Sequence, residues 1–167
     1  AAGLRVHPEH SDRAGIGASF QDSPCESRKE RYAGVEKRML AKAIDWLNLH
    51  YINEISDSQM ALKAVKRSEL LAEGLALAFV DVNDPNNGQS IKPPEPDKVA
   101  AWSAALSGVR QEIENSAGGF AKNDFLSVLD RVLVLNDSTV ELPQQPLVAH
   151  FAEAAFATLD PYTVMVW

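Results

Sequence analysis

Apolar residues recur every three or four positions along most of this chain, a pattern typical of helices that bury one side. The first such run follows Ser23-Pro24-Cys25-Glu26, where Ser23 can cap a helix and Glu26 completes a capping box. The pattern predicts a helix over residues 24–51. Its apolar side is expected to contain Val35, Met39, Ala43, Trp46, Leu47 and His50, with Tyr32 and Tyr51 as further aromatic anchors.

A second helix is predicted over residues 58–81, after a possible cap at Ser56-Asp57-Ser58. Only a short connection separates it from the first helix, so an antiparallel pair of helices is the expected geometry. The stripe that indicates this helix consists of Ala61, Val65, Ser68, Ala72, Leu75 and Phe79.

Residues 82–97 are predicted to form a loop, because they combine turn-forming residues with Pro93, Pro94 and Pro96. A third helix is predicted over 97–116. Gly118-Gly119 is expected to end it, since glycine readily adopts the left-handed conformation found after helices. Its narrow apolar seam contains Val99, Trp102, Leu106, Val109 and Ile113.

Two further helices are predicted in the last third of the chain. Asn123 is expected to cap a fourth helix that ends at Asn136-Asp137-Ser138, and residues 139–143 are expected to be extended. A fifth helix is predicted over 146–159, ending where Asp160-Pro161 stops it. The apolar sides contain Phe125, Leu126, Leu129, Val132 and Leu133 in the fourth helix, and Leu147, Val148, Phe151, Ala154, Ala155 and Leu159 in the fifth.

These elements predict an all-α fold, with about five helices in an irregular antiparallel bundle over residues 23–161. Residues 1–22 show no periodicity and are predicted to be a flexible tail. Residues 162–167 are β-prone and are expected to begin a strand. A single terminal strand cannot form a sheet, so the natural protein is expected to continue into a further domain.

Composition and charge restrict the class of protein. The chain has 167 residues, of which 46% are hydrophobic and 23% charged, typical of one globular domain. The 16 basic and 23 acidic side chains give a net charge of −7. An acidic chain without a basic stripe is a poor partner for nucleic acid. No apolar run approaches the roughly 18 residues of a membrane span.

Few residues offer metal or cofactor chemistry. Cys25 is the single cysteine, so an intrachain disulfide and a cysteine-based zinc site are excluded. His7 and His10 flank a proline and are interpreted as part of a solvated tail. The acidic stretch around Asp81 and Asp84 does not meet the EF-hand pattern, because Pro85 and Asn86 occupy the wrong positions. We therefore predict no metal and no other cofactor.

No catalytic constellation is apparent either. His50 is interpreted as a packed or helix-terminal histidine, and His150 is expected to be exposed near the start of its helix. Glu112 and Glu114 are two residues apart, so on a helix they point to different sides. There is no G-x-S-x-G nucleophile elbow. We predict no catalytic residue within the chain.

The stretch from Leu147 to Val166 resembles the segment that closes the N-terminal helical region of carboxyl-terminal processing peptidases. In that family a helix ends in L-D-P-[HY]-[ST]-x-[YF] and leads into a strand and a PDZ domain. Leu159-Asp160-Pro161-Tyr162-Thr163 matches the centre of this pattern, whereas Met165 stands where an aromatic residue is more usual. Trp46 with His50-Tyr51-Ile52 is weakly similar to an early helix of the family.

The resemblance implies a parent serine endopeptidase that uses a lysine base and a PDZ domain that binds substrate tails. Those parts lie downstream in the family, so no catalytic residue is transferred to this chain. The resemblance further implies that the helices support or oligomerise the downstream PDZ and protease core. It also implies a periplasmic or cell-envelope location. The tail 1–22 and the loop 82–97 have no counterpart in the family pattern.

Two other functions remain open from the residues alone. The chain can be a stand-alone helical interaction module, with grooves between helices that receive a partner segment. An independent small enzyme is a third class, which the missing His, Cys and carboxylate constellation disfavours. The sequence therefore predicts a non-catalytic helical domain, as part of a peptidase or on its own.

Overall fold

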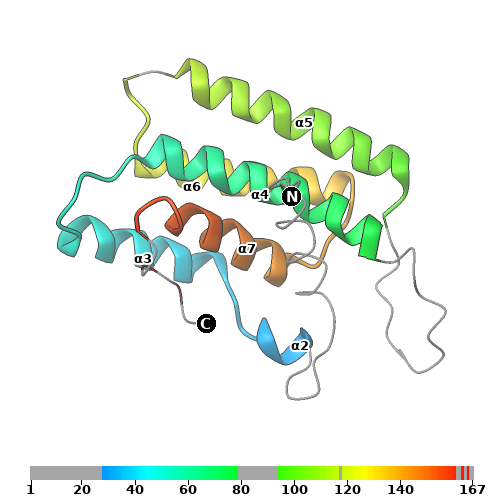
Figure 1. Ribbon diagram of the computed structural model, residues 1–167, viewed down its shortest axis with the longest axis horizontal. Coiled ribbons are helices and arrows are strands. Elements are labelled where there is room, and N and C mark those ends of the chain that lie inside the picture. The colour runs from blue at the N-terminus through cyan, green and yellow to red at the C-terminus, as the bar shows by residue number, and fades with distance from the viewer. Residues whose placement is uncertain (1–27, 79–93, 117, 161–162, 164, 166–167) are drawn as a thin grey trace, which may run out of the picture.

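The computed structural model describes residues 28–78, 94–116, 118–160, 163 and 165. Within these residues the chain forms one short helix and five helices of 13 to 22 residues, and contains no strand. The predicted all-α fold is therefore confirmed (Figure 1). The tail 1–22, the loop residues 82–93 and most of the predicted strand 162–167 lie outside the described residues.

The first predicted helix is divided into two. Helix α2 spans Arg28–Arg31 and helix α3 spans Lys37–His50. Gly34 separates them with a φ of +79°, in the left-handed region that a right-handed helix does not use. A continuous helix over 24–51 was thus a wrong prediction, because a turn at Gly34 redirects the chain; residues 24–27 lie outside the described part.

The side of α3 that is buried also differs from the predicted one, with Leu47 common to both. Leu40, Ile44 and Leu47 are buried at i, i+4 and i+7, whereas Trp46 is 62% exposed. The turn at Gly34 separates α3 from the residues before it. The side of α3 that is buried therefore depends on the packing of α3 itself, and does not continue the apolar stripe that begins at Val35.

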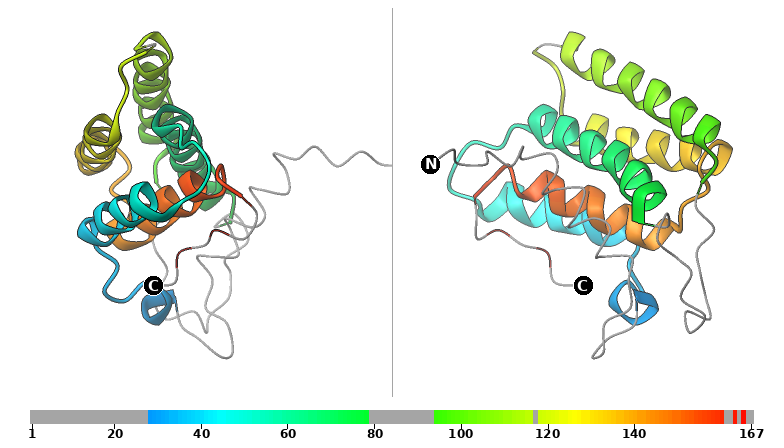
Figure 2. Two further views of the ribbon diagram at one scale, coloured as in Figure 1. Left: turned by 90° about the vertical axis from the view of Figure 1, so that its left-hand side faces the viewer. Right: turned by 45° about the vertical axis from the view of Figure 1, so that its right-hand side comes forward.

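Helix α4 (Asp57–Ala78) is the centre of the bundle. It packs most extensively against α7 (Gln144–Phe156), then against α5 (Pro96–Asn115) and α6 (Lys122–Ser138). In Figure 1, α4 runs opposite to α3, α5 and α7. Figure 2 shows α5 at the top, α4 and α6 in the middle, and α3 and α7 below.

The antiparallel direction expected for α3 and α4 is thus present, but α4 packs mainly on α7 and α5. Ion pairs connect α3 to α6 instead, namely Lys37 with Asp130 and Asp45 with Lys122. Exposed pairs of this kind contribute little stability individually.

The core that joins the helices is apolar. Its largest fully buried side chains are Trp102, Phe125, Phe151, Leu40, Ile44, Met60, Leu71, Leu75, Leu106, Leu129 and Leu147.

The predicted cap of α4 is confirmed, since the Ser56 hydroxyl accepts a hydrogen bond from the Gln59 amide at 3.4 Å.

Helix α5 begins at Pro96, one residue earlier than predicted, because proline is well suited to the first helical position. Trp102, Leu106, Val109 and Ile113 are buried as predicted, whereas Val99 is only partly buried. The Trp102 indole donates to the Ser68 carbonyl oxygen of α4 at 3.1 Å. Gly118 follows the helix with a φ of +102°.

Helix α6 begins one residue before the predicted cap. Ala121 precedes it, and the Ala121 amide donates to the Asp124 carboxylate at 2.8 Å. Asn123 therefore lies inside the first turn and is not the cap, because Asp124 satisfies the free amide of the residue before the helix. The helix ends at Ser138, as predicted.

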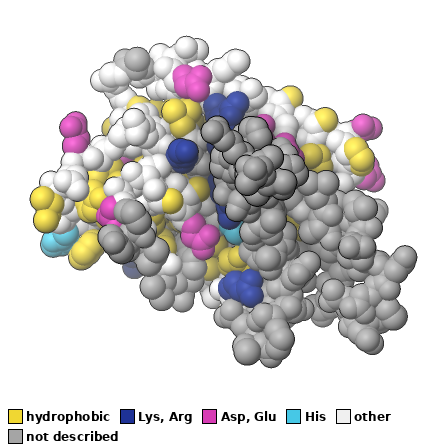
Figure 3. Space-filling view, viewed as in Figure 1, with side chains coloured by type: hydrophobic (Ala, Val, Ile, Leu, Met, Phe, Trp, Pro, Cys, Tyr) yellow, Lys and Arg dark blue, Asp and Glu magenta, His cyan; other side chains and the backbone are white. Residues whose placement is uncertain are grey.

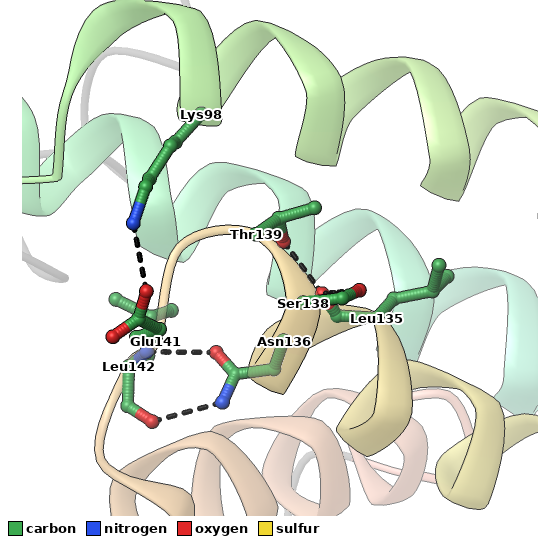
Figure 4. A network of polar contacts seen from close by, with 7 residues as sticks. All are labelled: Lys98, Leu135, Asn136, Ser138, Thr139, Glu141 and Leu142. Atoms are coloured by element: carbon green, nitrogen blue, oxygen red, sulfur yellow. Dashed lines mark hydrogen bonds and ion pairs between the residues drawn. The ribbon is translucent and has the colours of Figure 1, made fainter.

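Residues 139–140 form a turn and residues 141–143 have no regular structure, so the predicted extended segment 139–143 was wrong (Figure 4). The buried Asn136 amide donates to the Leu142 carbonyl at 2.9 Å and accepts from the Leu142 amide at 2.8 Å. Glu141 has a φ of +53° and pairs with Lys98 of α5 at 2.7 Å. The Asn136 side chain thus replaces the hydrogen bonds that a strand partner would supply.

Helix α7 is buried on nearly every side, whereas one apolar side was expected. It begins at Gln144 and is followed by a turn over residues 157–159. A helix covered all round occupies the inside of a bundle. Its buried residues are Pro146, Leu147, Val148, Ala149, His150, Phe151, Ala152, Ala155 and Phe156.

Candidate interaction surfaces

The corner after α7 is organised by one carboxylate. Asp160 accepts a hydrogen bond from the Tyr51 hydroxyl at 2.8 Å and another from the Thr163 amide at 2.8 Å. The Thr163 hydroxyl also donates to Asp160. The pKa of Tyr51 is raised, chiefly because ionisation would lose this hydrogen bond and next because of desolvation, and the negative charge of Asp160 acts in the same direction. Asp160 follows the end of α7, and its hydrogen bonds tie this corner to the end of α3.

An apolar surface surrounds the same end of α3. Trp46, Leu49 and Ile52 are 62%, 78% and 98% exposed. The His50 ring lies against Trp46, with ring centroids 4.7 Å apart. His50 is thus a helix-terminal histidine on the surface. In Figure 3 hydrophobic side chains lie beside a histidine at the left edge of the molecule. We call Trp46, Leu49 and Ile52 the α3 apolar surface.

His150 is buried, so its expected exposure was wrong. Its side chain contacts the hydroxyl of Tyr32, with 3.2 Å between Nε2 and the oxygen. Burial lowers the pKa of His150 to about 3, and the positive charges of Arg67 and Arg31 act in the same direction. Nδ1 lies 3.6 Å from the Glu153 carboxylate. His150 is therefore a neutral ring at neutral pH. The seven residues 146–152 contain no charge, and this signal could have predicted its burial.

The two carboxylates near the end of α5 lie on different sides of the helix. Glu112 forms a bidentate pair with Arg131 of α6, with the longer contact at 2.9 Å. This pairing lowers the pKa of Glu112. Glu114 instead lines a hollow shared with α4. The two groups are therefore not placed to act together on one substrate.

Metal-ligating side chains do not cluster in the part of the chain that the structure describes, where no group of three or more His, Cys, Asp or Glu could hold an ion. His7, His10, Cys25 and the stretch Asp81–Asn86 lie outside it. No described helix is both long enough and apolar enough to span a bilayer.

A basic groove lies between α4 and α7 and was not among the sites predicted from the sequence. Lys63, Lys66 and Arg67 of α4 line it together with Ala154 and Ala157. In Figure 3 basic side chains gather near the middle of the described surface. The 3/4 spacing of these three cations was a usable signal, which the overall acidity of the chain concealed.

Comparison of the chain with protein-family models, with curated proteins and with solved structures found no match in any of the three.

Proposed function

We propose that this chain is the non-catalytic N-terminal helical domain of a carboxyl-terminal processing serine peptidase. The observation that carries the proposal is the hydrogen bond between Tyr51 and Asp160. The two residues belong to the two segments that resemble the family, and a strongly hydrogen-bonded carboxylate joins them at the point where α7 ends. A corner held in this way sets the direction in which the following chain leaves the helices.

The α3 apolar surface gives such a domain a contact with its neighbour. Ile52 directly follows Tyr51, so a domain attached beyond the Asp160 corner would begin close to this surface. Exposed apolar patches of this kind mark contacts with another protein unit. We propose that the PDZ and protease part of the parent covers it. A periplasmic or cell-envelope location belongs to the same proposal.

Sequencing the transcript beyond the codon for Trp167 tests the proposal. We expect a PDZ-sized segment followed by a protease core with a serine and a lysine. A stop codon directly after Trp167 would overturn it.

In a parent of that kind, Trp46→Asp with Ile52→Asp should separate the helices from the core and expose the junction to limited proteolysis. Val134→Asp is the matched control, since Val134 is 67% exposed on α6, away from this surface. Equal proteolysis of both variants would contradict the role of the α3 apolar surface.

A stand-alone helical interaction module is the second candidate. The basic groove between α4 and α7 favours it, because grooves between helices commonly receive a partner segment. A chain that ends after Trp167 and still binds a polypeptide would support this candidate over the first.

A further inference from the structure

Two hollows adjoin between α4 and α7 and form one groove. Their volumes are about 550 and 340 Å³, and both are lined by Lys63, Lys66, Ala154 and Ala157. Arg110 of α5 lines the larger hollow and Arg67 of α4 lines the smaller one. We call this the α4/α7 groove.

The α4 wall of the groove carries cations that the fold leaves available. Lys66 contacts the Glu69 carboxylate at 3.3 Å, and Arg110 lies 3.6 Å from the same carboxylate. Lys63 and Arg67 form no ion pair with another residue in the described part of the chain. Two side chains four residues apart on a helix lie side by side. The groove therefore offers two neighbouring positive charges that have no ion-pair partner among residues 28–78, 94–116 and 118–160.

The α7 side of the groove presents the small side chains of Ala154 and Ala157, with Glu153 and Thr158 beside them. Ala154 and Ala157 leave room for another backbone to approach, and Leu62 and Leu70 of α4 extend the apolar lining. Glu114 and Glu153 are the carboxylates among the lining residues, against Lys63, Lys66, Arg67 and Arg110. The groove is thus locally basic on a chain whose net charge is −7.

We propose that the α4/α7 groove binds an acidic amphipathic segment of a partner polypeptide. Carboxylates spaced four residues apart on a helical segment have the separation of Lys63 and Arg67. The apolar side chains of the segment would lie over Ala154 and Ala157. A long nucleic acid is disfavoured, because its phosphates would extend from the short groove onto an acidic surface. Such binding does not depend on the peptidase proposal.

Fluorescence anisotropy with a labelled peptide of about 14 residues, roughly four helical turns, tests the proposal. The peptide repeats Glu at i and i+4 on one side and Leu on the other. We expect saturable binding that weakens as salt rises from about 0.05 M to about 0.5 M. The same peptide with Gln in place of Glu should bind at least about tenfold more weakly.

Substitutions locate the site. Lys63→Glu with Arg67→Glu should weaken binding about tenfold or more. Arg38→Glu with Lys42→Glu on α3 makes the same change in net charge away from the groove, and should change the affinity less than about threefold. If circular dichroism shows that the first variant is unfolded, Lys63→Gln with Arg67→Gln replaces it, with an expected loss of about threefold or more.

Three results would overturn the proposal. The first is equal affinity of the groove variant and the wild type, and the second is an equal loss in the α3 control. The third is tighter binding of a single-stranded oligonucleotide of similar charge, which would make the groove a general polyanion site.

Discussion

The hydroxyl of Tyr51 donates a 2.8 Å hydrogen bond to the carboxylate of Asp160, 109 residues further along the chain. The same carboxylate accepts the Thr163 amide. One side chain therefore joins the loop after α3 to the corner after α7.

Asp160→Ala should lower the free energy of unfolding by about 1–3 kcal/mol, because it removes the carboxylate that accepts hydrogen bonds from Tyr51 and Thr163. Thr163→Val removes only the hydroxyl contact and should cost less. Urea unfolding measures both values. An Asp160→Ala protein as stable as the wild type would show that the corner contributes nothing to the fold.

His150 should make the protein less stable in mild acid. Its folded-state pKa of about 3 lies below the ordinary value of 6.5, so between these values the unfolded chain binds a proton that the folded chain does not. The contribution of neutral His150 is complete above pH 6.5 and is lost as the pH falls toward 3. The expected slope is on the order of 1 kcal/mol per pH unit.

Denaturant unfolding at pH 7 and pH 5 measures this slope, and His150→Gln should reduce it. His50→Gln is the matched control, because the His50 side chain is exposed at the end of α3. Identical slopes for the wild type and His150→Gln would contradict the buried, neutral ring.

Two glycines should respond to alanine in opposite directions. Gly34 has a φ of +79°, so Gly34→Ala should destabilise the protein by about 1 kcal/mol. Gly108 lies within α5, and an added Cβ there meets nothing within 4 Å, so Gly108→Ala should stabilise it by up to about 1 kcal/mol. Thermal melting compares the pair. A stabilising Gly34→Ala would mean that α2 and α3 can join into one helix.

Asn136→Ala should destabilise the protein by about 2–3 kcal/mol, because it leaves the buried amide and carbonyl of Leu142 unsatisfied. Asn123→Ala is the control at an exposed position of α6 and should cost a few tenths of a kcal/mol at most. Chemical unfolding reports both. If Asn123→Ala lowered the free energy of unfolding as much as Asn136→Ala, Asn123 would be acting as the cap of α6.

Local spacing was enough to predict helices α4 to α7, although it did not predict the break between α2 and α3. The seam of Trp102, Leu106, Val109 and Ile113 repeats the helical period, and it is buried as expected. The cap at Ser56 and the end of α6 at Ser138 were also predictable, because caps and stop signals act within one turn of the chain. The all-α class follows from such short-range patterns.

Other features required contacts between distant segments. The uncharged run 146–152 indicates that His150 is buried. It does not state which helices cover α7 on nearly every side, nor that Tyr32 lies against the ring. The partnership of Tyr51 with Asp160 and the groove formed by Lys63, Arg67 and Ala154 join different helices. Helical periodicity encodes which residues share one side of a segment. Which segments then face one another depends on how the apolar sides pack into a common core, and only the tertiary structure of this protein decided that.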